Sequence, residues 1–236
     1  MPFPRSSIIA ALLLLASAHL GAQPGAQLPR GQVVERVRVD SVHSYALYLP
    51  SAWTAERAWP LLVALDPGGR GLVPVERFRA AAERRGWIVV GSYDARNGDA
   101  AQMAANDRAV DAILADAQRR FSIDRRRLYF AGMSGMARYA WGVAVQLDGE
   151  AAGLIGAAAG FPRPTGLWVA TLGRVRPFPY FGTTGTTDFN REEMEAVDSA
   201  LDPTSLPHRL ARFEGAHDWP PTASPRWRWT GWSSSS

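Results

Sequence analysis

The stretch "LYFAGMSGMARYAW", residues 128–141, joins two local patterns around a single serine. Its first residues are apolar or aromatic, as in a buried strand, and the residues after Gly135 are apolar at helical spacing. Ser134 lies where the strand is expected to end and the helix to begin. A strand–turn–helix of this kind is either a simple turn or an elbow that holds a serine nucleophile, as in the G-x-S-x-G pattern.

The segments on either side of this stretch alternate between strand and helix patterns. Residues 33–40 and 45–50 alternate between apolar and polar, which predicts strands with one wet face. Further strands are predicted from runs of apolar or small residues, and from a last alternating segment, at 61–65, 87–93, 127–132, 153–162, 177–188 and 208–219. Helices are predicted at 74–86, 106–121, 136–147 and 190–201. Repeated β–α units predict a single three-layer α/β domain, with a mostly parallel sheet and helices on both faces.

The composition fits one domain with a substantial core. Of the 236 residues, 47% are hydrophobic and 20% are charged, which argues against global disorder. The formal net charge of +4 is not concentrated in one arm, and the longest basic run, residues 125–127, precedes an apolar segment. We interpret this run as the solvated start of a strand, and nucleic-acid binding is not expected.

Residues 1–22 have the pattern of a secretory signal peptide. Arg5 is followed by an apolar run at residues 8–18, and small residues allow cleavage after Ala18 or Ala22. The run is shorter than the roughly 20 residues of a membrane span, so no stable span is expected after removal, although an uncleaved anchor is an alternative. Without cysteine, neither disulfides nor lipoprotein attachment can form. The expected location is secreted or periplasmic.

A serine nucleophile needs a base, and the sequence offers few candidates. Of the four histidines, His19 lies in the signal segment, and His43 and His208 precede or start strands, where they are expected to face solvent. His217 instead follows the last predicted strand, in "FEGAHDWPP". It is therefore the histidine best placed to reach a serine at the carboxyl edge of the sheet, although a structural loop histidine is the alternative.

The base in turn needs an orienting acid. Asp188, in "GTTGTTDFN", precedes the helix predicted at 190–201, so it is either that acid or a helix-capping aspartate. The order Ser134, Asp188, His217 is the chain order expected of α/β-hydrolases. Asp218 and Glu214 are the alternative acids. The same helix pairs Asn190 with Glu193 at the spacing of a capping box.

Acyl transfer also requires donors for an oxyanion. The N–H of Gly135, directly after the serine, is one candidate. The segment "LDPGGRG", after the strand predicted at 61–65, could supply a second from Gly68, Gly69 or Arg70. Taken alone, Pro-Gly-Gly is merely a turn. Its position after the strand at 61–65 is what completes a set of nucleophile, acid, base and oxyanion donors.

Taken in order, "LDPGGRG", "AGMSGMAR", "GTTDFN" and "GAHDWP" resemble the α/β-hydrolase superfamily, and within it the secreted serine esterases of the feruloyl esterase and polyhydroxybutyrate depolymerase type. The resemblance covers residues 33–221, which we take as the domain. It implies Ser134 as nucleophile, Asp188 as acid and His217 as base, with the loop after residues 61–65 in the oxyanion hole. A small-molecule or polymeric ester is implied as substrate, and no metal or organic cofactor.

Two features depart from that family. Met136 stands where the elbow motif has glycine, and residues 222–236 replace the closing helix with an atypical tail that carries Trp227, Trp229 and Trp232 and ends in four serines. We take the tail as irregular; it could come from a shifted reading frame or a truncated gene, or form a tryptophan-rich interface or sugar-binding patch.

Three functions remain open from the sequence. The first is a serine esterase that works through an acyl-enzyme. The second is a peptidase or lactone hydrolase of the same fold, because the triad is shared. The third is a hydrolase-like binding protein with an impaired elbow, suggested by Met136 and the tail. The acyl group, the alcohol and the oligomeric state are not specified by the sequence.

Overall fold

One mixed sheet organises the computed structural model, which describes residues 27–161 and 170–221. Its strand order is β1-β2-β4-β3-β5-β6-β7-β8. The strands are β1 (Val33–Arg38), β2 (Ser44–Tyr48), β3 (Trp59–Leu65), β4 (Ile88–Ser92), β5 (Ile123–Met133), β6 (Ala151–Ala157), β7 (Tyr180–Gly185) and β8 (His208–Phe213). The predictions for residues 1–22 and 222–236 fall outside the described residues.

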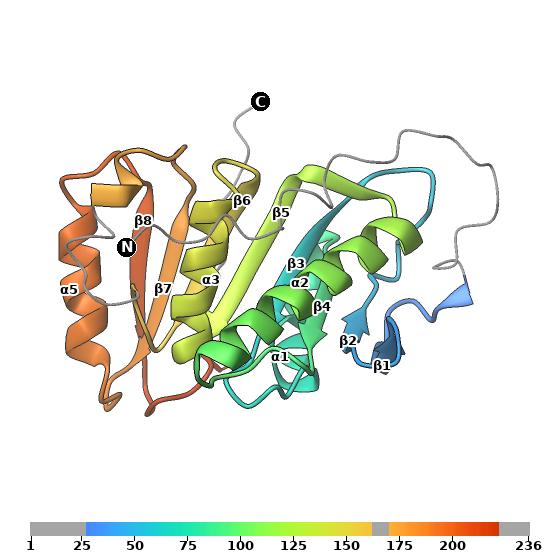
Figure 1. Ribbon diagram of the computed structural model, residues 1–236, viewed down its shortest axis with the longest axis horizontal. Helices are drawn as coiled ribbons and strands as arrows, with labels where there is room; N and C mark the ends of the chain where they lie inside the picture. The colour runs from blue at the N-terminus through green and yellow to red at the C-terminus, as the bar shows by residue number, and fades with distance from the viewer. Residues whose placement is uncertain (1–26, 162–169, 222–236) are drawn as a thin grey trace.

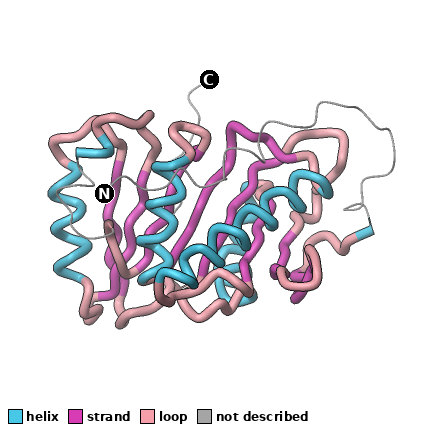
Figure 2. The backbone as a smooth tube through the Cα atoms, viewed as in Figure 1, coloured by secondary structure: helices cyan, strands magenta, loops and turns pink. Residues whose placement is uncertain are grey.

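The strands after the first two run parallel. β1 pairs with β2, and β2 with β4, in antiparallel register, whereas every later pairing in the sheet is parallel. Figure 2 shows the strands of this sheet in magenta and the helices that pack on it in cyan. Because β3, β5, β7 and β8 run parallel, their carboxyl ends lie at one edge of the sheet. The loops that follow these four strands meet at this edge. This edge brings together segments that lie far apart in the sequence.

Helices cover both faces of the sheet. They are α1 (Leu72–Arg85), α2 (Ala100–Arg120), α3 (Gly135–Gln146) and α5 (Arg191–Leu201). In Figure 1, α2 and α3 lie in front of the strands, and α5 lies beside β8 at the left edge of the view. α5 contributes Met194, Val197 and Leu201 to the same core as α2 and α3. On the opposite face, α1 packs its side chains Val75, Phe78 and Ala82. The predicted three-layer α/β architecture is confirmed.

The central strand β3 shows why a continuous apolar run marks burial on two sides. Successive strand side chains point to opposite faces. Leu61, Val63 and Leu65 accordingly belong to the core under α2 and α3, and Leu62 and Ala64 to the core under α1. The reading of residues 61–65 as a doubly buried strand is confirmed. The basic run at residues 125–127 is exposed near the start of β5, as expected.

The helix expected at 106–121 is six residues longer at its N-terminus. α2 starts at Ala100, and the carboxylate of Asp99 caps it by accepting a hydrogen bond from the N–H of Gln102 (3.0 Å). Residues 100–105 are mostly alanine, so no apolar stripe marked them as helical. The extension matters because it places the buried side chain of Asn106 inside the helix, facing the loop after β4.

The capping box expected at the start of α5 is wrong. The side chain of Asn190 makes no cap and donates to the carbonyl of Ala158 (2.9 Å). Glu193 reaches away from the helix start and pairs with Arg138 of α3 at 2.7 Å. Both side chains bind partners that are distant in the sequence, Ala158 and Arg138, and the local sequence pattern does not predict these contacts.

We expect Asp116→Ala to destabilise the fold strongly. The buried carboxylate of Asp116 accepts hydrogen bonds from the hydroxyl of Tyr45 (2.9 Å) and from Arg120 (2.6 Å), which ties β2 to α2. Breaking a buried charged pair typically costs about 3–5 kcal/mol. The melting temperature should fall by about 6–20 °C. Asp202→Ala, which removes an exposed carboxylate near His208, is the control and should shift it little. Equal melting temperatures for the two variants would contradict the expectation.

Candidate active site

Ser134 occupies a strained turn between β5 and α3. Its backbone has φ 54° and ψ −129°, a conformation that non-glycine residues adopt rarely and mostly at functional sites. A Cβ on Gly132 would lie 2.2 Å from the carbonyl oxygen of Met136, so glycine is needed there for the helix to start against the strand. Met136 itself is fully buried in the core. The methionine therefore fits beside the elbow, and the close approach depends on Gly132.

The three residues singled out by chain order meet above the carboxyl edge of the sheet. His217 Nε2 lies 2.9 Å from Ser134 Oγ, and His217 Nδ1 lies 2.8 Å from Asp188 Oδ1. The serine follows β5, the aspartate follows β7 and the histidine follows β8. Both distances are within hydrogen-bonding range, so the side chains form one continuous chain, the Ser134–His217–Asp188 triad.

The loops that carry Asp188 and His217 are fixed to each other. The N–H of Asn190 donates to Asp188 Oδ1 (2.8 Å), and the side chain of Asp188 is fully buried. A Cβ on Gly185 would lie 2.3 Å from the carbonyl oxygen of Gly215, so glycine lets the two loops touch. The N–H of Thr187 donates to that same carbonyl (2.9 Å). Acid and base are thus held by backbone contacts as well as by their own hydrogen bond.

The alternative acids lie elsewhere. Glu214 accepts from the hydroxyl of Thr186 (3.1 Å), and Asp218 accepts from the N–H of Trp219 (2.7 Å) and pairs with Arg77 (3.6 Å). Neither has a hydrogen bond with His217 in the described part of the chain. Asp188 is therefore the carboxylate in contact with the histidine.

The other two histidines of the domain are not solvent-facing, contrary to expectation. The side chains of His43 and His208 are only 16% and 15% exposed. His43 Nδ1 lies 2.8 Å from Asp40, and His208 Nε2 lies 3.4 Å from Asp202. Each imidazole therefore lies against a nearby carboxylate. A position next to the start of a strand does not predict such a contact. Neither is part of the triad.

The loop after β3 turns its N–H groups onto one residue, Asp66. The N–H groups of Gly68 and Arg70 donate to Asp66 Oδ1 (2.9 and 3.4 Å), and that of Gly69 donates to the Asp66 carbonyl (3.0 Å). The N–H of Gly135 is the first of α3 and has no acceptor within the helix. A donor role for Gly68, Gly69 and Arg70 stays a prediction, because all three N–H groups are used within their own turn.

Asp66 was not singled out from the sequence, yet it joins two loops of the site. Its buried carboxylate accepts from Trp219 Nε1 (3.0 Å), two residues beyond His217, and from the guanidinium of Arg70 (2.8 Å). Burial alone would raise the pKa of Asp66. The hydrogen bonds from Arg70, Trp219 and Gly68 outweigh that effect and lower the pKa below its usual value. The carboxylate is therefore ionised at neutral pH and anchors both loops.

Phe189 covers the histidine of the triad. Its ring stacks on the imidazole of His217 with centroids 4.0 Å apart and planes 25° apart. The residue is nevertheless 76% exposed. The only signal in the sequence is that Phe189 directly follows Asp188 in "TTDFN". A single apolar residue in a loop forms no pattern, so its contact with His217 is not predicted. Arg138 of α3 pairs with Glu193, and Trp141 is buried in the core.

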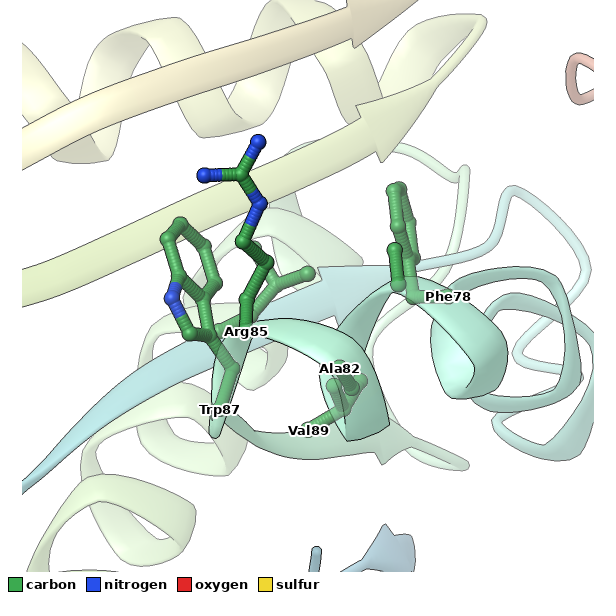
Figure 3. A pocket seen from close by; sticks show the side chains of 7 residues that line it. Phe78, Ala82, Arg85, Trp87 and Val89 are labelled. Carbon is green, nitrogen blue, oxygen red and sulfur yellow. The ribbon is translucent and has the colours of Figure 1, made fainter. Parts of the chain in front are cut away.

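A separate pocket lies on the α1 face of the sheet. In Figure 3, Arg85 and Trp87 line one side of it and Phe78 the other, with Ala82 and Val89 between. None of the triad residues lines it. Within residues 27–161 and 170–221, no three histidine, aspartate or glutamate side chains cluster as metal ligands would. No helix in this part of the chain has the length and apolar character needed to cross a membrane.

Solved structures that are similar to this chain include esterases and related serine hydrolases. The fluorophosphonate-binding serine hydrolase F of Staphylococcus aureus matches with a TM-score of 0.64 and 12% identity, over 80% of this chain and 93% of its own. A ferulic acid esterase matches with a TM-score of 0.57 and 15% identity, over 80% and 92%. Esterase 2 of Thermogutta terrifontis, phosphonylated by sarin, matches with a TM-score of 0.56 and 17% identity, over 78% and 84%.

These similarities define the fold, which is that of the α/β-hydrolases. A scan against models of protein families gave no match, and neither did a search of curated proteins. The likeness to serine esterases is structural, and at this low identity it does not extend to a particular activity.

Proposed function

We propose that this protein is a serine hydrolase that cleaves carboxylic esters through an acyl-enzyme intermediate. The observation that carries the proposal is the continuous hydrogen-bonded chain from Ser134 through His217 to Asp188. A serine hydroxyl is a weak nucleophile, and an adjacent base with its own orienting acid is what activates it. Export of the chain, which residues 1–22 suggest, belongs to the same proposal.

The geometry supports a two-step reaction. Ser134 Oγ attacks the ester carbonyl while His217 Nε2 takes its proton, and Asp188 holds the Nδ1–H of the ring and stabilises the imidazolium. The alcohol leaves with the proton returned by His217, so the acyl group stays on Ser134. Water then attacks that acyl group, again through His217, and the carboxylic acid is released. The N–H of Gly135, at the N-terminus of α3, is placed to stabilise the oxyanion in both steps.

A substrate panel tests this proposal against peptidase and lactonase activity. Purified protein should hydrolyse nitrophenyl esters of graded acyl length, and should turn over matched anilides and lactones much more slowly. The dependence of kcat/KM on acyl length would separate a preference for short-chain esters from one for long-chain esters. Faster turnover of the anilides or lactones would overturn the assignment to esters. No turnover of any of the three classes would favour the hydrolase-like binding protein.

Phe189 should contact the apolar part of the substrate. Its outer face is exposed beside the triad, and covering about 60 Å² of apolar area is worth roughly 1.5 kcal/mol, or about tenfold in binding. We expect Phe189→Ala to raise KM for butyrate or longer esters about tenfold, with a smaller effect on acetate esters. The control is Val42→Ala, which truncates the other large exposed hydrophobic residue of the described chain, 69% exposed and lying between β1 and β2. If Phe189→Ala left KM for the longer esters unchanged relative to KM for the acetate ester, Phe189 would not be part of the substrate site.

A further inference from the structure

The triad needs two oxyanion donors, and the structure leaves one of them unassigned. The N–H of Gly135 has no acceptor within α3. The N–H groups of Gly68, Gly69 and Arg70 all donate to Asp66. Because the Asp66 carboxylate also accepts from Trp219 and from the Arg70 guanidinium, releasing the N–H groups of Gly68 and Arg70 would disturb both loops. A second donor from another element would leave this arrangement intact.

The amide of Asn97 lies against the residue that follows the nucleophile. A Cβ built on Gly135 would be 2.3 Å from Asn97 Oδ1 and 2.9 Å from Asn97 Nδ2. The Asn97 amide thus occupies the space that a side chain at position 135 would fill, one residue from Ser134. Its side chain makes no hydrogen bond to any residue that the structure describes, although an amide can make several. The residue is exposed.

The backbone under Asn97 is fixed from two sides. The N–H of Asn97 donates to the carbonyl of Pro67 (2.9 Å), in the loop after β3. The fully buried side chain of Asn106 accepts from the N–H of Arg96 (3.0 Å) and donates to its carbonyl (2.9 Å). A polar side chain without a partner therefore stands on a rigid backbone. A fixed backbone limits where this amide can reach, so the only adjustment left to the donor is rotation of its own side chain.

The geometry points to the Asn97 amide as the second oxyanion donor, an inference that rests on the proposed ester hydrolysis. When Ser134 Oγ bonds to the ester carbon, the π electron pair of the carbonyl moves onto its oxygen. That oxygen accepts hydrogen bonds from the Gly135 N–H and from Asn97 Nδ2–H. A half-turn about Cβ–Cγ exchanges the two ends of the amide, which presents Nδ2 to the site. The electron pair returns as the alcohol leaves, and no proton is transferred to Asn97.

Two substitutions of Asn97 distinguish a role as hydrogen-bond donor from a role in packing alone. Asn97→Ala removes the amide, and Asn97→Asp keeps its shape but replaces the donor with an acceptor. Loss of one oxyanion donor typically lowers kcat by about 10²–10³-fold, and we expect this of both variants, with little change in KM. The control is Gln32→Ala, which removes an exposed amide before β1 and should leave kcat unchanged. The melting temperature should stay the same in all three.

The affinity for a trifluoromethyl ketone inhibitor provides a second measurement, which a purely structural role of Asn97 would not change. It adds reversibly to a serine nucleophile and places an oxyanion in the hole. We expect its affinity to fall in Asn97→Ala by the same factor as kcat/KM. Full activity in either variant, a rise in KM alone, or unchanged ketone affinity would overturn the role of Asn97. If the unaltered protein hydrolyses no ester, the proposed function itself fails, so the two failures are distinguishable.

Discussion

Ser134→Ala is expected to lower kcat for nitrophenyl ester hydrolysis by about 10⁵-fold or more, because removing the nucleophile of a serine triad costs about as much as removing the whole triad. The remaining rate would come from substrate binding and the oxyanion donors alone. Initial rates at saturating ester, at matched protein concentration, measure the loss. Ser41→Ala, which removes an exposed serine hydroxyl before β2, provides the matched control and should keep full activity.

The same substitution should leave the fold intact. Ser134 is half-buried, and the residue keeps its φ of 54° through the packing of Gly132 against α3. We expect a melting temperature within a few degrees of the unaltered protein, so a loss of activity cannot be ascribed to unfolding. If Ser134→Ala retained more than a few per cent of the esterase activity, another group would be the nucleophile.

Asp188→Asn is expected to lower kcat about 10⁴-fold while preserving the fold. The carboxylate accepts the Nδ1–H of His217 at 2.8 Å, which leaves Nε2 free to take the proton of Ser134. An amide that donates to Nδ1 favours the opposite tautomer, and losses of that size follow in serine triads. The measurement is again the steady-state rate on a short-chain nitrophenyl ester, with KM determined separately.

Two neighbouring carboxylates serve as controls for Asp188. Asp218→Asn and Glu214→Gln change acids that lie one and three residues from His217, yet both carboxylates bond elsewhere. Each should lower kcat no more than a few-fold. A large loss in either, with Asp188→Asn remaining active, would reassign the acid.

The sequence predicts most of the sheet because burial leaves a clear pattern. β3 reads as a continuous apolar run since both its faces are covered, and β1 reads as an alternation since it lies at an edge. The sequence does not predict the start of α2, because the alanines at 100–105 carry no amphipathic signal. The capping box at Asn190 and Glu193 was wrong because distant partners, Ala158 and Arg138, compete for those side chains.

The positions of Ser134, Asp188 and His217 could be predicted because chain order and strand ends place them at one edge. Met136 fits beside the elbow, because its side chain is buried in the core and the close contact with the helix falls at Gly132. The contacts of Asp66 and Asn97 could not be predicted. Each depends on loops distant in sequence, those after β8 and β5 respectively.

Peptide mapping after reaction with a fluorophosphonate probe tests the central claim most directly, because the probe phosphonylates an activated serine and no other group is assigned that role. We predict one adduct per chain, located on the peptide that contains Ser134, with none formed in Ser134→Ala and much slower formation in His217→Ala. An adduct on a different residue, or an unaltered folded protein that forms none, would contradict the account.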